Sequence, residues 1–575
     1  MAYEIKLHDA YKGFTRDQDK MIAPEETVNR FREKLKRVDL DILEETVRID
    51  NGRLDIPVYF SVCGRDAEAV IGTKKQMGKG GTPAQAEASA VMELAERFSF
   101  FSFCKNSENF FTARYSEMGD NAIPLEQIAR SVHDDGPDVQ QALALFSRIP
   151  LQWTWGYSLT RNQPICLPFN WFYAINEFNG PSAGNCAEEA LSQGICEVVE
   201  RHVSSLVSRE RRRVPGIDLH TARDELVVEM VRKYERAGVM LFASDFSLDT
   251  GIPTVSVLAY DPATFPEKSE IVWTAGTTPH PEKALSRALT EIAQLAGDFN
   301  SNSNYVASGL PKLRNREEGK FIMEAERMIS LADLPNLSSD NIKTEVEHSV
   351  SALAKVGMEV ISIDVTHPEL GVPAFYTIVP GAHFRERALG TSVAMFSAKI
   401  LAEDHDPAEA IPALQQMDRD IPDKYFVQFY LGYCFLRQEN PSEALPHFRK
   451  ALRMEPKEDD ISSIYSYLGI CLKDLGRYRE ALEALQKGER YDPERTDIQN
   501  LMGFCHYALK EHAKAIERFK KVIRIDPTSA IDYANIGSNY RELGEREKAV
   551  RYYRLALELD PNIMFARENL RRLEQ

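Results

Sequence analysis

A repeat with a period of about 34 residues in the C-terminal third is the feature that most constrains how this chain can fold. Glycine, alanine and proline recur there in three series that advance along the chain by identical steps. The recurring positions are Gly432, Gly469, Gly503 and Gly537; Ala444, Ala481, Ala515 and Ala549; and Pro456, Pro493, Pro527 and Pro561. Ala410 and Pro422 each lie one period before the first member of their series. This period predicts stacked pairs of helices, because one pair cannot bury its apolar face alone.

The pattern within each unit resembles the tetratricopeptide repeat over residues 406–561. In the fourth full unit the matching positions are Tyr533, Ile536, Gly537, Tyr540, Ala549, Tyr553 and Pro561. Small residues let two antiparallel helices approach closely, and proline ends each pair because it cannot continue a helix. We expect an all-α solenoid over 396–575 with about four full repeats. A partial first unit, with its first helix in 386–403, and a polar capping helix from NIMFARENLRRLEQ complete it.

Stacked repeats form a groove suited to an extended peptide or a helix, so we expect the array to recruit a peptide or protein substrate or a protein partner. The array could instead form a homodimer or brace the first domain. Cys434, Cys471 and Cys505 each follow a repeat glycine at the second position after it, which is a packing position. The chain has no CxxC pair and no zinc-type spacing with histidine. We therefore expect buried, reduced thiols in a cytoplasmic protein.

Length, charge and hydropathy exclude several classes of protein. The 575 residues predict two or three domains. A formal net charge of −17 argues against nucleic acid or an anionic membrane as the main partner. The N-terminal segment MAYEIKLHDAYKGFTRDQDK contains no apolar stretch, so we expect no signal peptide. No long uncharged apolar run is present, so we expect no transmembrane helix.

Residues 1–395 are predicted to form one α/β domain with mixed sheets and packed helices. The expected strands are rich in β-branched and aromatic residues and lie at 55–63, 252–261, 269–276, 358–365 and 372–380. The expected amphipathic helices lie near 25–37, 84–102, 186–208, 223–237, 281–298 and 319–332.

Three of these helices share one spacing of polar side chains. The stripes are Ser89, Glu93, Glu96 and Arg97 in the first; Gln193, Glu197, Glu200 and Arg201 in the second; and Arg287, Glu291 and Gln294 in the third. Positions i, i+4 and i+7 lie along one face of a helix, and Asn185 and Glu189 extend the second stripe upstream. A single stripe of this kind is usually an exposed, salt-bridged surface. Three matched stripes in apolar surroundings indicate carboxylates that face an interior cleft.

Several ionised carboxylates in a buried cleft are costly unless cations compensate them. The arginines of the stripes can balance part of the charge. Magnesium can balance the rest, because it takes hard oxygen ligands and commonly bridges carboxylates to nucleotide phosphates. The stripes therefore predict a magnesium and nucleotide site.

A basic, glycine-rich segment at 72–81 precedes the first striped helix, and we interpret it as a flexible loop. It is not a Walker motif, which requires G-x4-G-K-[ST]. The interval between Gly72 and Gly78 is one residue too long, and Gly80 follows Lys79 where Ser or Thr is needed. This excludes a P-loop NTPase.

Three motifs together resemble the YcaO family. They are GKG-x(7–9)-SA-x2-E-x2-ER from Gly78 to Arg97, N-x3-EA-x2-QG-x2-E-x2-ER from Asn185 to Arg201, and AL-x-RALTE-x2-Q from Ala284 to Gln294. The segment KMIAPEETVNRF also fits the opening of the family, and the resemblance covers about residues 10–390. It implies Mg²⁺- and ATP-dependent activation of a backbone amide: a nucleophile adds to the amide carbon, and the amide oxygen is phosphorylated and leaves as phosphate.

The same resemblance implies roles for individual residues. Implied metal ligands are Glu93, Glu96, Glu189, Glu197 and Glu200. Implied nucleotide-binding residues are Lys20, Thr27, Lys79, Ser89, Asn185, Gln193, Glu197, Arg201 and Arg287. Those expected to be catalytic are Glu93, Glu200, Arg201 and Arg287. Phosphoryl transfer needs positioning and charge neutralisation more than a protein nucleophile, which suits this set.

The resemblance leaves the reaction product open. Members that form azolines by cyclodehydration often end in a proline-rich PxPxP tail, whereas this chain ends RRLEQ, so we expect a reaction other than azoline formation. One alternative is an ATP-binding accessory or adaptor protein for β-methylthiolation of a ribosomal protein. Another is thioamide formation with a separate TfuA-type partner.

Overall fold

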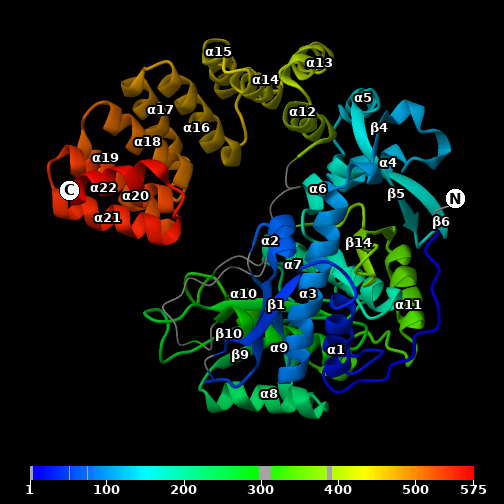
Figure 1. Cartoon of the computed structure of the whole chain (residues 1–575). Helices are drawn as coiled ribbons and strands as arrows, with labels where there is room; N and C mark the ends of the chain where they lie inside the picture. Colours follow the sequence, from blue (N-terminus) through cyan, green and yellow to red (C-terminus); the bar gives the residue numbers. More distant parts are fainter. Residues whose placement is uncertain (1–3, 51, 74, 297–298, 300–312, 385–390) are drawn as a thin grey trace. The chain divides into compact units, whose positions relative to one another are not determined.

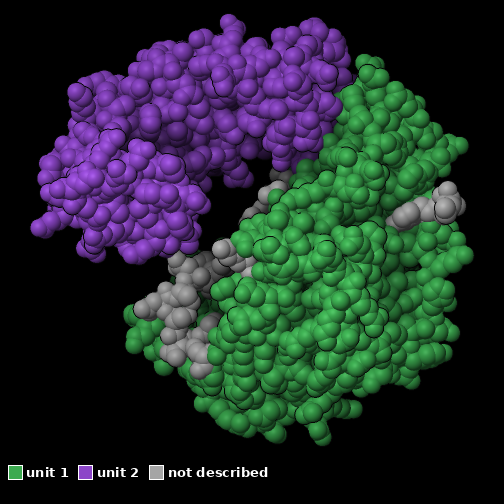
Figure 2. Space-filling model, viewed as in Figure 1, with its two compact units in different colours: residues 1–136, 147–393 green, residues 137–146, 394–575 purple. Residues whose placement is uncertain are grey.

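The computed structural model describes residues 4–50, 52–73, 75–296, 299, 313–384 and 391–575. The chain divides into two compact units, one of residues 1–136 and 147–393 and the other of 137–146 and 394–575 (Figure 2). The division near residue 393 lies close to the expected boundary at 395. A short internal segment, 137–146, groups with the C-terminal unit, and no signal in the sequence indicated this.

Three sheets form the framework of the first unit (Figure 1). The first has the order β1-β2-β3, with strands Leu43–Arg48, Val58–Cys63 and Lys75–Lys79. The second has the order β11-β10-β9-β8-β12, with strands Val272–Thr277, Thr254–Tyr260, Met240–Asp245, Gly216–Asp218 and Met328–Ser330. The third has the order β4-β5-β13-β14-β7, and β6 also pairs with β5. Its strands are β4 (Phe111–Arg114), β5 (Pro150–Ser158), β13 (Ile361–Asp364), β14 (Ala374–Ile378), β7 (Pro181–Ala183) and β6 (Gln163–Pro168). The pairing is antiparallel except between β8 and β12.

Helices pack against these sheets. Those of the first unit are α1 (Pro24–Leu35), α2 (Arg65–Ile71), α3 (Pro83–Lys105), α4 (Leu125–Ser131), α6 (Phe169–Asn176), α7 (Ala187–Glu210), α8 (Glu225–Arg236), α9 (Pro281–Ala296), α10 (Lys320–Met323) and α11 (Ile342–Lys355). Helix α3 lies on β2 and β3, α7 on β7 and β14, and α9 on β10 and β11. The three striped helices therefore each cover a different sheet.

Glycine lets two of these helices approach a strand closely. A Cβ added to Gly78 of β3 would overlap the backbone of α3 at Ala90. A Cβ added to Gly276 of β11 would overlap the carbonyl of Ala284 at the start of α9. The glycine before Lys79 is thus required by strand-to-helix packing. The expectation of a flexible loop at 72–81 is wrong for residues 75–79, which form β3 paired with β2.

The predicted mixture of sheets and helices is confirmed. Each of the five expected strands overlaps an observed one, namely β2, β10, β11, β13 and β14. The expected helix at 319–332 is wrong over most of its length: only Lys320–Met323 is α-helical, and Met328–Ser330 pairs with β8 as a strand. Pairing with a strand that is distant in the sequence overrides the local helical pattern there.

The C-terminal unit is a run of helices, as predicted. Its members are α5 (Val139–Phe146), α12 (Val393–Asp404), α13 (Pro407–Asp420), α14 (Tyr425–Arg437), α15 (Pro441–Arg453), α16 (Glu458–Asp474), α17 (Tyr478–Tyr491), α18 (Thr496–Ala508), α19 (His512–Ile525), α20 (Ala530–Glu542), α21 (Arg546–Leu559) and α22 (Met564–Glu574). Residues 385–390, which include the start of the expected first helix, lie outside the described part of the chain. The expected capping helix is α22, which packs on α21.

The repeat glycines bring the two helices of each pair together. A Cβ on Gly432 would lie 2.9 Å from the Phe448 ring, and one on Gly503 would lie 2.7 Å from Phe519. Cys434, Cys471 and Cys505 are buried in the array, and burial raises the pKa of each thiol. Within the described chain, no helix combines the length and apolar character that a membrane span requires.

Candidate functional site

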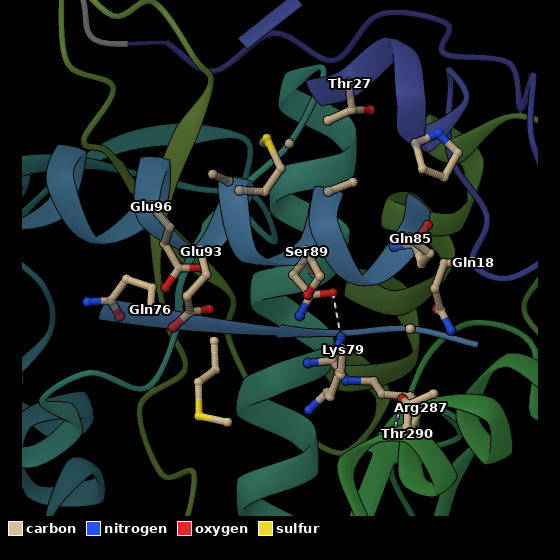
Figure 3. A pocket seen from close by; sticks show the side chains of 18 of the residues that line it. Gln18, Thr27, Gln76, Lys79, Gln85, Ser89, Glu93, Glu96, Arg287 and Thr290 are labelled. Carbon is tan, nitrogen blue, oxygen red and sulfur yellow. Dashed lines mark hydrogen bonds between the residues drawn. The ribbon is translucent and has the colours of Figure 1, made fainter. Parts of the chain in front are cut away.

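A cavity of about 500 Å³ lies in the first unit where the three striped helices face one another (Figure 3). Helices α3, α7 and α9 contribute side chains to it, as do strand β3, helix α1 and the segment before α1. Most of the lining is polar or charged. The predicted site residues that line it are Lys20, Thr27, Lys79, Ser89, Glu93, Glu96, Asn185, Glu189, Gln193, Glu197, Arg201 and Arg287.

The stripe of α3 presents two carboxylates to this cavity. Ser89, Glu93 and Glu96 project from the same side of the helix, as predicted from their spacing (Figure 3). Arg97 donates from Nε to Oε1 of Glu93 at 3.0 Å and lies 3.5 Å from Oε1 of Glu96. Burial raises the pKa of Glu96 well above its ordinary value, and the charge of Glu93 adds to that rise. A cation bound between the carboxylates of Glu93 and Glu96 would stabilise their ionised forms.

Helix α7 places Glu189 and Glu197 on the same cavity. Oε2 of Glu189 accepts hydrogen bonds from the backbone N–H and the side-chain amide of Asn185, each at 3.0 Å. Its Oε1 accepts from the backbone N–H of Met21 at 2.6 Å. Burial raises the pKa of Glu197, and the charges of Arg201 and Arg97 oppose the rise. The carboxylate of Glu189 therefore accepts hydrogen bonds from Asn185 and Met21 and also faces the cavity.

Glu200 is turned away from the lining of the cavity, unlike the other predicted residues. Its Oε2 accepts from the backbone N–H of Thr277 at 3.2 Å, at the end of β11. The same oxygen lies 3.5 Å from Nε of Arg287, and Oε1 lies 3.6 Å from Arg201. Glu200 thus connects α7 to β11 and orients two arginines of the site. A direct role as metal ligand stays a prediction.

Helix α9 and strand β3 supply the cationic side of the cavity. Arg287 donates to Oε1 of Gln193 at 2.8 Å, which joins the second stripe to the third. Lys79 forms an ion pair with Glu291. Burial lowers the pKa of Lys79 to about 7, and the charge of Arg287 contributes to the fall. An anion bound in the cavity would favour the protonated form of the Lys79 amine.

The segment before α1 closes one side of the cavity with the predicted Lys20 and with Asp17 and Gln18, which the sequence did not indicate. Asp17 is 1% exposed, and its Oδ2 accepts from the backbone N–H groups of Gly81 and Thr82 at 2.7 and 3.1 Å. Burial raises the pKa of Asp17 to about 6, although these two donors lower it. Lys283 holds the same segment by donating to the carbonyl of Thr15 at 2.7 Å.

Other lining residues were also missed as site residues. They are Asp17, Gln18, Lys75, Gln76, Gln85, Arg97, Thr290, Glu291 and Gln294. Arg97, Glu291 and Gln294 belong to the predicted stripes, so the spacing itself could have found them. Gln85 lies four residues before Ser89 and extends the first stripe upstream, so the same spacing could also have found it. Asp17 carries no such signal, because only the tertiary fold brings it to the cavity.

The donors of this cavity fit a nucleotide and a hard divalent cation. Lysines and arginines suit phosphate oxygens, carboxylates suit magnesium, and the volume lies in the range of small-molecule sites. Oε1 of Gln85, a residue 7% exposed at this cavity, has no hydrogen-bond partner in the described part of the chain. Among the residues that the structure describes, no three His, Cys, Asp or Glu side chains are grouped closely enough to hold a metal by themselves. Magnesium is commonly held by one or two carboxylates together with phosphate oxygens and water, which fits such a site.

Residues 77–383, more than half of the chain, match the model of the family described as YcaO cyclodehydratase, ATP- and Mg²⁺-binding. The chain belongs to the YcaO family. This confirms the predicted family and its cofactors, ATP and Mg²⁺. Three tetratricopeptide-repeat models match residues 397–459, 435–505 and 494–562, which confirms the predicted repeats.

Two relatives and one solved structure illustrate how this YcaO chain compares with others. An uncharacterized protein of Methanothermobacter thermautotrophicus is 28% identical over 380 residues, covering 63% of this chain and 94% of that protein. The ribosomal protein S12 methylthiotransferase accessory factor YcaO of Escherichia coli is 29% identical over 393 residues, covering 62% of this chain and 64% of that protein. A heterocyclase solved in complex with substrate and cofactor shares the fold with a TM-score of 0.55 at 24% identity, covering 66% of this chain and 55% of that one.

Proposed function

We propose that this YcaO protein uses Mg²⁺ and ATP to activate a backbone amide of a peptide or protein for modification. The observation that carries the proposal is the meeting of carboxylates from α3 and α7 with cations from β3, α7 and α9 in one cavity. Such a site can neutralise a triphosphate and hold it in one orientation, which is the main requirement of phosphoryl transfer. Bound ATP would supply the phosphoryl group that converts the amide oxygen into a leaving group, and Mg²⁺ would neutralise the charge of the phosphates.

The residues of the chain divide these tasks according to charge and position. Glu93 and Glu96 are the cavity carboxylates best placed to hold a divalent cation, because they share the single charge of Arg97 between them. Arg287 and Lys79 face the cavity as phosphate ligands, and Gln193 orients Arg287. Glu200, which is not among the residues that line the cavity, orients Arg287 and Arg201 through its carboxylate oxygens. Ser89, Asn185, Lys20 and Thr27 complete the predicted nucleotide site.

Nucleotide binding and turnover test the proposal. Isothermal titration of the full chain with AMPPCP and MgCl₂, and phosphate release from ATP, should both be positive in the wild type. Glu93→Gln and Arg287→Met should each weaken Mg²⁺-dependent binding by about tenfold or more, since each removes a charged contact. Glu44→Gln, at an exposed position on β1, is the matched control and should bind as the wild type does. A wild-type chain that neither binds nor hydrolyses ATP would contradict the proposal.

A second candidate is an ATP-binding accessory protein that assists another modification enzyme. The similarity to the accessory factor of Escherichia coli favours it, as do the tetratricopeptide repeats, a family suited to protein recruitment. Affinity capture with the full chain, with and without ATP, separates the two. A stable enzyme partner together with ATP turnover too slow to support modification would favour the accessory role.

Mass spectrometry of a modified peptide identifies the chemistry if the chain acts as an enzyme. Loss of water indicates an azoline, and exchange of oxygen for sulfur indicates a thioamide. Transfer of a labelled amide oxygen into the released phosphate would support O-phosphorylation of the amide in either case.

A further inference from the structure

A cluster of three aromatic rings in the first unit, which we call the aromatic platform, presents one large exposed apolar side chain. Its members are Phe178, in the loop after α6, Phe101 of α3 and Tyr173 of α6. The centroid of the Phe178 ring lies 5.7 Å from that of Phe101 and 6.4 Å from that of Tyr173. Phe101 and Tyr173 are half-buried, whereas Phe178 is 44% exposed. Single exposed apolar residues are common on protein surfaces, so the surroundings of this ring decide whether it has a role.

Arg97 connects the aromatic platform to the candidate nucleotide cavity. Its guanidinium donates from Nε to Oε1 of Glu93 at 3.0 Å. Its Cζ lies 5.9 Å from the centroid of the Phe178 ring, within the range of about 6 Å for a cation–π contact. Arg97 lines the cavity and Phe178 does not, so the platform lies beside the cavity. One guanidinium therefore separates the exposed ring from a carboxylate of the site.

The turn that presents Phe178 is strained and hydrogen-bonded. Glu177 has φ 47° and ψ −114°, a conformation that residues with a side chain rarely adopt. The carbonyl of Asn176 accepts from the backbone N–H and the side-chain amide of Asn179, at 2.9 and 2.8 Å. Strain of this kind persists only where the surrounding structure imposes it, and it is most frequent at active sites and ligand clamps.

The two ends of the cavity differ in chemistry. Glu93 and Glu96 lie toward one end, and Gln85 and Gln18 lie toward the other (Figure 3). About three turns of α3 separate Gln85 from Glu96, which is about 16 Å along the helix axis. The platform adjoins the carboxylate end, because Arg97 contacts both. The proposed function assigns the divalent cation, and with it the reacting phosphate, to Glu93 and Glu96, so the substrate amide must enter at that end.

We infer that the aromatic platform binds a large apolar side chain of the peptide substrate, one or two residues away from the amide that is activated. An extended peptide spans about 3.3 Å per residue, so such a side chain can reach a ring that one guanidinium separates from the site. The apolar ring suits neither phosphates nor a cation with oxygen ligands, which leaves the peptide as its occupant. An aromatic side chain should bind best, since ring contacts with Phe178 add to the burial of apolar surface. The inference rests on the proposed function and adds the class of peptide to it.

Saturation-transfer NMR with the full chain, AMPPCP and MgCl₂ tests this inference. The probes are capped pentapeptides of glycine with phenylalanine, leucine or serine at the central position. The phenylalanine peptide should bind at least about tenfold more tightly than the serine peptide, with the leucine peptide between them. Its ring protons should receive the strongest saturation. Equal affinity for the phenylalanine and serine peptides, or no measurable binding of the phenylalanine peptide at millimolar concentration, would overturn the inference.

Variants of Phe178 separate the platform from general apolar attraction. Phe178→Ser should weaken binding of the phenylalanine peptide by about tenfold, and Phe178→Leu should retain part of the preference. Phe111→Ser is the matched control and should bind as the wild type does, because Phe111 of β4 is 40% exposed and does not line the cavity. Circular dichroism and an unchanged affinity for AMPPCP verify that each variant is folded with its nucleotide site intact. An unchanged preference in Phe178→Ser would contradict the inference. A change in oligomeric state without a change in peptide binding would also contradict it, by assigning the platform to contact between copies of the chain.

The same measurements distinguish failure of this inference from failure of the proposed function. If the wild type does not bind AMPPCP but keeps a preference for phenylalanine that depends on Phe178, the proposed function is wrong and the platform remains a peptide site. If AMPPCP binds and the three peptides bind alike, the nucleotide site remains and the platform has no role in peptide binding.

Discussion

The backbone N–H of Met21 donates a 2.6 Å hydrogen bond to the buried carboxylate of Glu189 on α7. This bond fastens the segment before α1 to the helix that carries the second stripe, beside the cavity that both of them line. The neighbouring Glu188 holds the same segment by accepting from the backbone N–H of His8 at 2.6 Å. One wall of the candidate nucleotide site therefore depends on carboxylates that accept main-chain donors.

Loss of the Glu189 carboxylate should loosen this wall even without ligands. In Glu189→Ala the N–H of Met21 and the amide of Asn185 lose their acceptor, so the free energy of unfolding should fall by about 2 kcal/mol. Hydrogen–deuterium exchange of residues 14–23, measured without nucleotide or Mg²⁺, should become faster. A role limited to metal binding would leave that exchange unchanged. Glu44→Ala at an exposed strand position is the control and should exchange as the wild type does.

Arg287 should be sensitive to a conservative change because it joins two elements. It donates to Gln193 at 2.8 Å and lies 3.5 Å from Glu200. Arg287→Lys keeps the charge but loses the planar fork, so the KM for ATP should rise by about tenfold. Gln193→Leu removes one partner and should have a smaller effect. Arg232→Lys, at an exposed position on α8, should leave KM unchanged; an equal rise in this variant would contradict a specific role for Arg287.

Titration of Asp17 should make the free energy of unfolding depend on pH, and the direction of its pKa shift fixes the sign of that dependence. Burial raises the pKa of this carboxyl to about 6 from an ordinary value of 3.8, so the folded state binds its proton more tightly than the unfolded state. The resulting stabilisation is fully present below the unfolded pKa and is lost as pH rises through 6. The free energy of unfolding should therefore fall by about 1 kcal/mol from this group between roughly pH 5 and pH 7.

Urea denaturation across that range measures the effect. Asp17→Asn cannot titrate, so the difference in unfolding free energy between wild type and variant should change with pH by the amount given above. The charge of Lys283 lowers the pKa of Asp17 and the charge of Asp224 raises it, and both groups are unchanged in the variant. A difference that stays constant with pH would show that Asp17 is ionised throughout.

Gly432 should tolerate alanine poorly despite its place inside a helix. Alanine is the better helix former by about 1 kcal/mol, but a Cβ there would meet the buried Phe448 ring at 2.9 Å. Overpacking of this kind costs about 1–3 kcal/mol, so we expect net destabilisation in Gly432→Ala. Phe448→Leu makes room, and the double variant should be less destabilised than the sum of the two single changes. Additive effects in thermal unfolding would contradict the close approach.

Regular spacing explains why much of this protein could be predicted. The turn of a helix fixes which residues share a face, so the spacing alone puts Ser89, Glu93 and Glu96 on one side of α3. The repeat period likewise predicted the helix pairs and the close contact at Gly432. Arg97 and Glu291 also lie on the stripes, and a stricter use of the same spacing would have included them.

The remaining features depend on which distant segments meet. Residues 75–79 form a strand because β2 pairs with them and α3 packs on Gly78, whereas their composition alone suggested a loop. Residues 328–330 likewise form a strand because of pairing with β8. Asp17 reaches the cavity through hydrogen bonds from Gly81 and Thr82, which no local pattern encodes.

The sequence by itself determined the repeat array, the three stripes and the family, since each follows from periodic or contiguous residues. Only the tertiary structure decided that Glu200 turns toward β11 and that Glu189 holds the segment before α1. The physical reason is that helical spacing is set by neighbours along the chain. The choice of hydrogen-bond partner for a buried polar group is set by whichever remote atoms the fold brings within about 3 Å.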